Sequence, residues 1–197
     1  MALQGWYVKQ VTRKEITDFI ETWHYSGSIN GCIADYCYAL FSPDDKMCGG
    51  MFYGRMAMAG QWKRFRENGA ETESDVIELR RLACIDDTPR NAESFFISRT
   101  IKLLRKAWEG KLIVSYADKE YNHSGTIYKA SNFTKIGDIA GAKVIVTNEG
   151  RRYHDKAIRT KYKGELKPFA KRLIVKLEDG TAHFAKTKGK HTYLYEL

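Results

Sequence analysis

The stretch from Val76 to Ala117 constrains the fold of this chain more than any other part of its sequence. An apolar, β-like run is followed by a segment with apolar side chains at helical spacing and then by a short apolar run between breakers. Two strands joined by such a helix lie parallel in one sheet, and the crossover is almost always right-handed. The sequence therefore predicts neighbouring parallel strands, Val76–Cys84 and Lys111–Ala117, linked by a helix at Asn91–Trp108.

Hydrophobic patterns on either side of this unit predict the rest of one domain. Before it we expect a helix at Val8–Trp23, a hairpin of two strands and a polar loop (Ala34–Ser42, Met47–Met58 and Gly60–Ser74). After it we expect a short helix at His123–Asn132 and then strands with turns. This order predicts an α/β (α+β) fold with a mixed central sheet and helices on both faces. Residues 1–197 are expected to form a single domain, with the basic C-terminal strands 150–197 integral to it.

Positive charge is concentrated in the second half of the chain. The formal net charge is +9, yet residues 1–90 carry 11 Lys and Arg against 13 Asp and Glu. Residues 91–197 carry 22 against 11, and 150–197 alone carry 13 against 5. Such asymmetry is typical of proteins that bind a polyanion. A solvated basic surface is the alternative, and the alternation of cations with aromatic residues favours binding.

Other bulk features indicate the compartment. No apolar run reaches the length of a membrane span, and the start of the chain lacks the pattern of a secretory signal. We therefore expect a cytoplasmic protein with no membrane partner. The four cysteines have no CxxC spacing and lie in apolar stretches, which favours buried free thiols over a zinc site. The oligomeric state stays open, a homodimer included.

Four side chains are candidates for chemistry at the end of the predicted strand Lys111–Ala117. Asp118 follows this strand, where ligand clefts of open α/β sheets lie, and Tyr128 could face back over the same cleft. His24 and Tyr25, on the loop after the first helix, could complete it. A histidine, a carboxylate and phenols form a hard donor set that suits iron. Each also has a structural interpretation, as a turn cap for the aspartate and as packing for the rings.

The segment Ser115–Phe133 resembles a known superfamily. It contains Tyr-Ala-Asp and, further on, His-Ser-Gly-Thr-Ile-Tyr-Lys-Ala-Ser-Asn-Phe. In the acetyltransferase superfamily called GNAT, a strand is followed by a helix with the pattern Ile-Tyr-x-x-x-Gly/Asn-Phe, and Tyr128 lies where that pattern has its tyrosine. The resemblance implies acetyl-CoA as cofactor and Tyr128 as the acid that protonates the departing CoA thiolate.

Further motifs resemble the Mom family of phage DNA-modification proteins, which shares this segment. The resemblance spans residues 20–197 in the same order and includes His24-Tyr25, Glu78–Leu82, His123–Phe133 and Lys190–Tyr195. It implies a phage-encoded transferase that works in the host cytoplasm. Such an enzyme would convert adenine in double-stranded DNA to N6-carbamoylmethyladenine and protect phage DNA from restriction. Asp118 and Tyr128 would be its catalytic residues.

The implied product also bears on the metal. It joins the adenine nitrogen to a saturated carbon, whereas attack on a thioester would join the nitrogen to a carbonyl carbon. A redox-active metal is therefore a reasonable hypothesis for the family. The candidate ligands for iron are His24, Tyr25, Asp118 and Tyr128.

The loop before the predicted long helix departs from the superfamily pattern. That loop is usually rich in glycine, but Asp86–Ala92 contains none. Amides at a helix N-terminus can still hold phosphate, and Arg90 and Asn91 would assist them. Arg80 and Arg81 are expected to point to opposite faces of their strand, and we expect Arg80 to face the cleft and bind CoA phosphate or substrate.

Three basic clusters are candidates for DNA contact. The loop at Trp62–Arg66 mixes rings and cations, as a loop that opens the duplex or receives a flipped base would. The other two start at Arg151 and at Lys186, and a solvated edge strand protected by lysines is the alternative for the last. The expected contacts are Trp62, Lys63, Arg64, Arg66, Arg151, Arg152, Lys188 and Lys190.

Two other functions stay open. A conventional GNAT N-acetyltransferase for a small amine or a protein lysine would have an acidic acceptor groove, which the basic second half disfavours. A DNA-binding module on an inactive GNAT scaffold would explain the missing glycine loop. The intact segment Asp118–Tyr128 argues against that module.

Overall fold

The chain forms two compact units. The computed structural model describes residues 3–29 and 31–197. Unit 1 comprises the described residues up to Ala117 together with Gly125–Gly137 and Thr192–Leu197, and unit 2 comprises Asp118–Ser124 and Asp138–His191. The expected single domain with strands 150–197 integral to it stays a prediction, and each unit is described by itself.

A seven-stranded mixed sheet organises unit 1. Its strand order is β1-β2-β3-β4-β5-β12-β6. Neighbours from β1 to β4 are antiparallel, whereas β4 and β5 are parallel, as the sequence predicts. The strands are β1 Tyr7–Val11, β2 Tyr36–Phe41, β3 Met47–Arg55, β4 Val76–Cys84, β5 Leu112–Asp118, β6 Thr134–Ile139 and β12 Lys190–Glu196.

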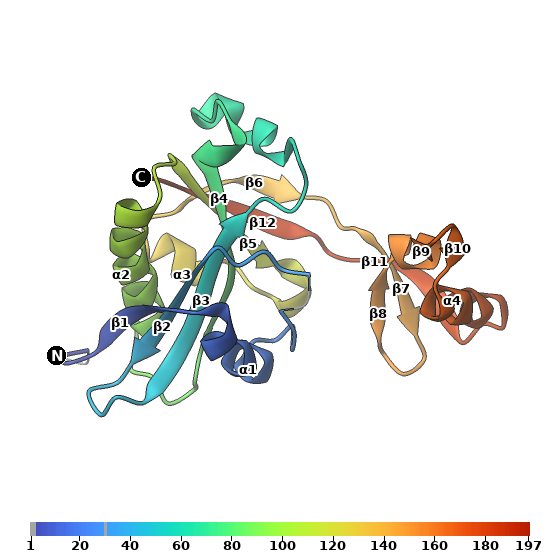
Figure 1. The fold of residues 1–197 in the computed structure, drawn as a ribbon, viewed down its shortest axis with the longest axis horizontal. Coiled ribbons are helices and arrows are strands. Elements are labelled where there is room, and N and C mark those ends of the chain that lie inside the picture. Colours follow the sequence, from blue (N-terminus) through green and yellow to red (C-terminus); the bar gives the residue numbers. More distant parts are fainter. Residues whose placement is uncertain (1–2, 30) are drawn as a thin grey trace. The chain divides into compact units, whose positions relative to one another are not determined.

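Helices cover both faces of this sheet (Figure 1). Side chains alternate along a strand, so that Tyr38 of β2 packs with α2 (Ala92–Ala107) and Cys37 packs with α1 (Arg13–Trp23). Two apolar clusters result, one against each helix, and a third holds Phe65 against Leu112 and Val114 of β5. The α/β prediction, a mixed sheet with helices on both faces, is confirmed.

The N-terminal prediction was wrong in one respect. The expected helix from Val8 is the strand β1 followed by α1, which begins at Arg13. Thr12 sets this start, because its backbone N–H donates to the Glu15 carboxylate at 2.6 Å and its hydroxyl accepts from the Glu15 N–H. This capping box is a local signal for a helix start at 13. The expected loop at 60–74 contains the short 3₁₀ segments η1 (Gln61–Asn68) and η2 (Glu73–Asp75).

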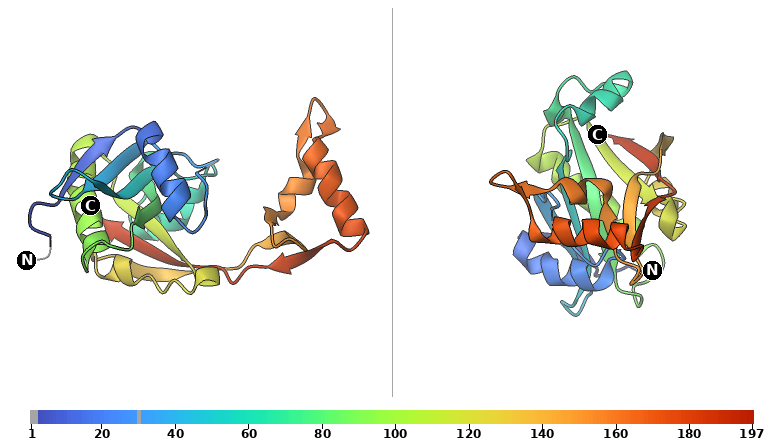
Figure 2. Two further views of the ribbon diagram at one scale, coloured as in Figure 1. Left: turned by 90° about the horizontal axis from the view of Figure 1, so that it is seen from below. Right: turned by 90° about the vertical axis from the view of Figure 1, so that its right-hand side faces the viewer.

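Unit 2 is a small sheet covered by a helix (Figure 2). Its strand order is β11-β7-β8, and Leu173 of α4 packs with Ile145 and Ala182 of the sheet. The expectation of strands alone after Phe133 was wrong here. Leu173-Ile174-Val175 has a strand-like composition, but Pro168 in the first turn begins a helix. The elements are η3 Lys119–Tyr121, β7 Lys143–Thr147, β8 Arg152–His154, η4 Asp155–Arg159, β9 Lys161–Tyr162, β10 Glu165–Leu166, α4 Pro168–Glu178 and β11 Ala182–Lys186.

The cysteines agree in part with the expectation of buried free thiols. All four thiols are free, and Cys37 and Cys48 are buried. Burial raises the pKa of Cys37 to about 11 and that of Cys84 to about 12, so neither is a thiolate at neutral pH. Within the described residues, no helix is both long and apolar enough to span a bilayer.

Candidate active site

The strands β4 and β5 part midway, and this fork is the centre of unit 1. Their parallel pairing runs from Val76 opposite Leu112 to Leu79 opposite Ser115 and goes no further. A bulge in β4 lies at the same point, because Phe52 and Tyr53 of β3 oppose Arg81 and Leu79 and leave Arg80 as the extra residue. Beyond the fork, β4 therefore has peptide groups on this edge that β5 does not bond.

Tyr128 lies at the fork. It belongs to α3 (Thr126–Lys129), is buried, and its ring lies 5.4 Å from that of Tyr193 and 5.7 Å from that of Phe133. Its hydroxyl hydrogen-bonds with Ser115, whose own hydroxyl donates to the Leu79 carbonyl at 3.1 Å. Burial, the largest influence, raises the pKa of Tyr128. The phenol therefore stays protonated at neutral pH and is a hydrogen donor at the fork.

Gly125 explains why this segment has a glycine before its tyrosine. Its φ is +71°, and a Cβ there would lie 2.2 Å from the Tyr193 ring. Only glycine tolerates both the left-handed backbone and the close approach. The resulting α3 is one short turn and not the helix expected over His123–Asn132.

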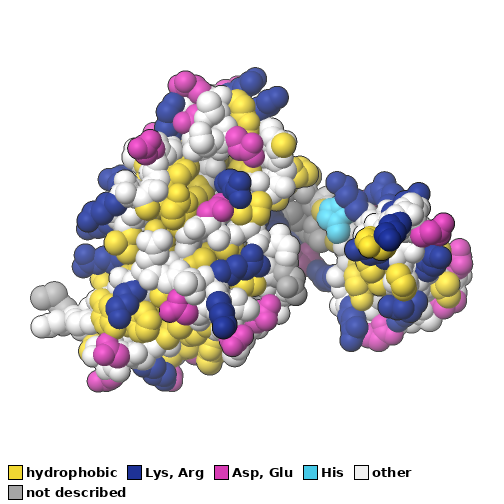
Figure 3. Space-filling model, in the orientation of Figure 1, with side chains coloured by type: hydrophobic (Ala, Val, Ile, Leu, Met, Phe, Trp, Pro, Cys, Tyr) yellow, Lys and Arg dark blue, Asp and Glu magenta, His cyan; other side chains and the backbone are white. Residues whose placement is uncertain are grey.

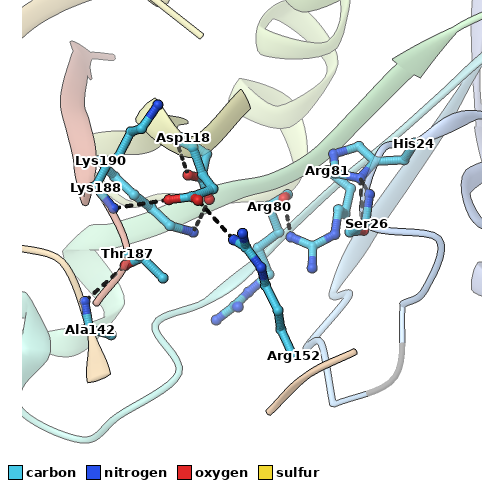
Figure 4. A network of polar contacts seen from close by, with 11 residues as sticks. His24, Ser26, Arg80, Arg81, Asp118, Ala142, Arg152, Thr187, Lys188 and Lys190 are labelled. Atoms are coloured by element: carbon cyan, nitrogen blue, oxygen red, sulfur yellow. Dashed lines mark hydrogen bonds and ion pairs between the residues drawn. The ribbon is translucent and has the colours of Figure 1, made fainter. Parts of the chain in front are cut away.

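A half-buried ion pair next to the fork was not singled out as a site by the sequence. Glu78 lies 3.4 Å from the Arg80 guanidinium, and only 15% and 8% of these two side chains are exposed. Burial, followed by the Glu78 charge, raises the pKa of Tyr116 to about 12. Arg80 also donates to the Arg55 carbonyl at 2.6 Å. Its own carbonyl accepts from the Arg81 guanidinium at 2.8 Å (Figure 4). Arg80 thus has internal partners here, and its predicted contact with CoA stays a prediction.

The N-terminus of α2 borders a hollow of about 360 Å³. Asn91 takes the left-handed backbone conformation, with φ at 69°, that glycine usually supplies, so the turn forms without a glycine. Arg90 and Asn91 are both exposed, and Asn91 borders the hollow. Hydroxyls, amides and cations line it and suit a phosphate-bearing ligand: Asn91, Ser94, Ser98, Lys102, Arg105, Ser131 and Asn132.

His24 and Tyr25 follow α1. His24 is buried, and its Nδ1 lies 2.8 Å from the Ser26 hydroxyl and accepts from the Ser26 N–H at 3.1 Å (Figure 4). The Tyr25 ring lies 4.1 Å from the imidazole. These contacts join the two residues to Ser26, whereas Tyr128 contacts Ser115 and two aromatic rings. Whether all four predicted side chains line one pocket stays a prediction.

Asp118 belongs to unit 2 and lies in an ion-pair network. Its carboxylate caps η3 by accepting from the Glu120 N–H at 3.0 Å, and it lies 3.5 Å from the Lys190 ammonium (Figure 4). Glu120 pairs with Arg152 at 2.9 Å and accepts from the Lys188 N–H at 3.0 Å, and these bonds lower its pKa. The predicted DNA contacts Arg152 and Lys190 therefore each have a carboxylate partner.

The proposed iron ligands do not fit that metal in this arrangement. Among residues 3–29 and 31–197, no three His, Cys, Asp or Glu side chains are grouped to hold an ion. The ammonium of Lys190 lies beside Asp118, and burial disfavours the phenolate of Tyr128 that would bind iron. The iron hypothesis has no support here, and we derive no step through a metal.

The Trp62–Arg66 loop forms η1. Phe65 is buried and anchors this segment, while Lys63, Arg64 and Arg66 are exposed. The Arg66 guanidinium lies 5.2 Å from the Trp62 ring centre, a cation–π contact that holds both side chains at the surface. The loop thus presents cations beside an aromatic ring, as the sequence suggests.

Nearly the whole chain matches a known protein family. The sequence of residues 5–197 matches the model of the Mom protein family. The chain belongs to the Mom family. One curated relative is the methylcarbamoylase Mom of Escherichia phage Mu, 35% identical over 80 residues, which are 40% of this chain and 32% of that protein. The aligned part thus spans about a third of that relative.

Solved acetyltransferases share the fold. A Bacillus subtilis acetyltransferase in complex with CoA has a TM-score of 0.51 at 12% identity, over 98% of this chain and 97% of that one. NAA60 of Arabidopsis thaliana, in complex with acetyl-CoA, has a TM-score of 0.52 at 10% identity, over 98% of both chains. The resemblance to the Mom family and to the GNAT fold is confirmed.

Proposed function

We propose that this Mom family protein is a transferase that modifies adenine in double-stranded DNA at N6, to the carbamoylmethyl derivative, with acetyl-CoA as cofactor. The observation that carries the proposal is the protonated Tyr128 hydroxyl at the fork of β4 and β5. In a cell carrying a phage, such a product would protect phage DNA from restriction in the host cytoplasm. The Mom membership and the acetyltransferase-like fold support this assignment.

Unit 1 has two places whose residues could bind a CoA thioester. The edge of β4 that β5 does not bond beyond Leu79 would offer peptide groups to an amide-bearing arm. The hollow beside Asn91 would offer hydroxyls and cations to phosphates. When bound, the cofactor would supply an activated two-carbon unit. Tyr128 would donate its proton to the leaving thiolate, because its raised pKa keeps that proton available at neutral pH. Acyl transfer alone would bond N6 to the carbonyl carbon. The carbamoylmethyl product has N6 on the methyl carbon instead, so it requires an oxidant that takes up two electrons when this N–C bond forms. It also requires an ammonia-level nitrogen donor that displaces the CoA thiolate when the amide forms.

Unit 2 supports DNA as the partner. It carries 15 Lys and Arg against 8 Asp and Glu, and Lys and Arg side chains are spread over the face that Figure 3 shows. Arg151 is exposed and has no carboxylate within 4 Å in the described chain, so its charge is available for a phosphate. Arg152 and Lys190 would contribute after exchanging their carboxylate partners for phosphate oxygens, and Lys188, which bonds Glu120 through its backbone N–H, would contribute its ammonium.

Nucleoside mass spectrometry of DNA from cells that express the protein tests the proposal. We expect a heavier adenosine with the wild type and with Tyr7→Phe, which removes an exposed phenol that bonds only Asp45 in the described contacts. Tyr128→Phe should lower its yield about 100-fold if the phenol is a general acid. Unmodified DNA with folded wild-type protein would overturn the proposal.

One observation favours a second candidate, a conventional N-acetyltransferase. Glu78 is a half-buried carboxylate near the fork and could take the proton of an amine acceptor. In that case the purified protein would acetylate small amines in the presence of acetyl-CoA, and Glu78→Gln would abolish this activity. An inactive scaffold that only binds DNA would do neither.

A further inference from the structure

Unit 2 has a cleft of its own, apart from the fork of unit 1. It has a volume of about 340 Å³ and lies between α4 and the β7–β8 hairpin. Neither the family match nor the acetyltransferase likeness gives it a role. Its lining combines cations, rings and one carboxylate: Thr147, Glu149, Arg151, Tyr153, Phe169, Arg172, Leu173 and Lys176.

The charges in the cleft favour an anion. Glu149 and Lys176 form an ion pair at 2.6 Å, which neutralises both, and the Lys176 bond is the main reason that the pKa of Glu149 falls to about 2. Arg151 and Arg172 are exposed, and no carboxylate of the described chain lies within 4 Å of either guanidinium. Two uncompensated guanidinium groups in one cleft suit a phosphodiester, which each can bind in bidentate fashion.

The rings in the cleft favour a planar, partly apolar group. Phe169, on the first turn of α4, is 38% exposed although it is a large apolar side chain. Tyr153 is half-buried and packs against the unit 2 core that contains Leu173. A ring held in place by such packing is a platform on which a base can stack at little entropic cost. A carboxylate-bearing peptide would use the arginines and leave the Phe169 ring without a matching surface.

We propose that this cleft holds one unpaired nucleotide of the DNA strand, with its phosphate on Arg151 and Arg172 and its base against Phe169 and Tyr153. The base must leave the stack and so be unpaired, because inside a duplex both of its faces are covered by the neighbouring bases. The inference rests on the proposed function in that the same DNA is the substrate. It adds that unit 2 binds the DNA at a position where the duplex is locally opened.

Fluorescence of a single-stranded oligo(dT) that carries one 2-aminopurine tests this inference with the full-length protein. The wild type should quench the 2-aminopurine on binding, because the base stacks on a ring. Phe169→Leu should remove the quenching and weaken binding about tenfold. Phe184→Leu is the matched control, since Phe184 is another exposed ring of unit 2 that lies outside the cleft lining. It should leave quenching and affinity unchanged.

A second pair of variants, both on α4, tests the phosphate contact of the cleft arginines. Arg172→Gln should weaken binding about fivefold and reduce the slope of log affinity against log salt by about 0.7, one phosphate contact on a single strand. Lys171→Gln removes the same charge from the neighbouring position, which does not line the cleft, and should change affinity less than twofold. A fully paired duplex of the same sequence should bind without quenching.

The outcomes separate this inference from the proposed function. Quenching that survives Phe169→Leu, or equal losses for Arg172→Gln and Lys171→Gln, would overturn the nucleotide cleft. That result could coexist with adenine modification by the wild type, which would leave the proposed function standing. Conversely, a wild type that quenches as expected but leaves cellular adenine unmodified would overturn the function and keep the cleft.

Discussion

Unit 1 and unit 2 differ in their charge balance and in the size of their apolar cores. Unit 1 carries 18 Lys and Arg against 16 Asp and Glu, and its large sheet buries a protonated phenol and partly buries a Glu–Arg pair. Unit 2 carries 15 against 8 around a small core of Ile145, Leu173 and Ala182. A deep core can hold the groups that chemistry needs in fixed protonation states, while a small basic unit can present cations to a polyanion. We therefore propose that unit 1 carries the chemistry and that unit 2 contacts the DNA.

The largest effect should come from packing in unit 1. Gly125→Ala would combine a left-handed backbone with a clash on Tyr193, and we expect a loss of about 3 kcal/mol in the free energy of unfolding. Gly164→Ala is the control in unit 2, because its φ is +84° and nothing lies within 4 Å of the added Cβ. It should lose only about 1 kcal/mol, the cost of the backbone alone. Urea unfolding measures both, and equal losses would break the comparison.

The next effect concerns catalysis without binding. Tyr128→Phe should lower adenine modification about 100-fold while the affinity for duplex DNA stays within twofold of the wild type. The reason is that the phenol is buried at the fork of unit 1, where it bonds Ser115. Parallel measurement of modification and of DNA binding checks this. A matching loss of affinity would mean that unit 1 also carries the main DNA contact.

The next smaller effect is a loss of DNA binding that comes from unit 2. Arg151→Ala combined with Arg152→Ala should weaken binding to all duplex sequences alike and reduce the salt slope by about 2. Arg151→Ala should change the free energy of unfolding little, because Arg151 is exposed. Arg152→Ala also removes the ion pair of Glu120. Titrations at several salt concentrations provide the slope. An unchanged slope would remove unit 2 from the DNA interface.

The smallest effect is an acid sensitivity of unit 2. The Lys176 bond lowers the pKa of Glu149 from its ordinary 4.5 to about 2. A depressed carboxyl pKa contributes stability that is present above pH 4.5 and is lost as the pH falls from there toward 2. Glu149→Gln should therefore flatten the pH dependence of unfolding in this window. Unfolding curves between pH 5 and 2 that match those of the wild type would show that the pair adds nothing, as many exposed pairs do.

Parts of the candidate site could be predicted because they rest on local patterns. The sequence singles out Tyr128 through its motif, and Asn91 through its place before a helix. It could not give the partner of Tyr128, because Ser115 meets that hydroxyl only when β5 and α3 pack. It also missed Glu78 as a polar group of the site. The available signal was a glutamate within an apolar strand. Only the fold shows that this carboxylate is partly shielded from solvent and pairs with Arg80.

The sequence by itself determined the parallel pair β4–β5, the helix between them, the hairpin before them and the uneven charge. Each follows from periodicity and composition within a short stretch, which act before any distant contact forms. Tertiary structure decided the bulge at Arg80, the helix at Pro168–Glu178 and the cleft of unit 2. These depend on strand register and on which surface covers an apolar run, and both are set by residues far apart in the chain.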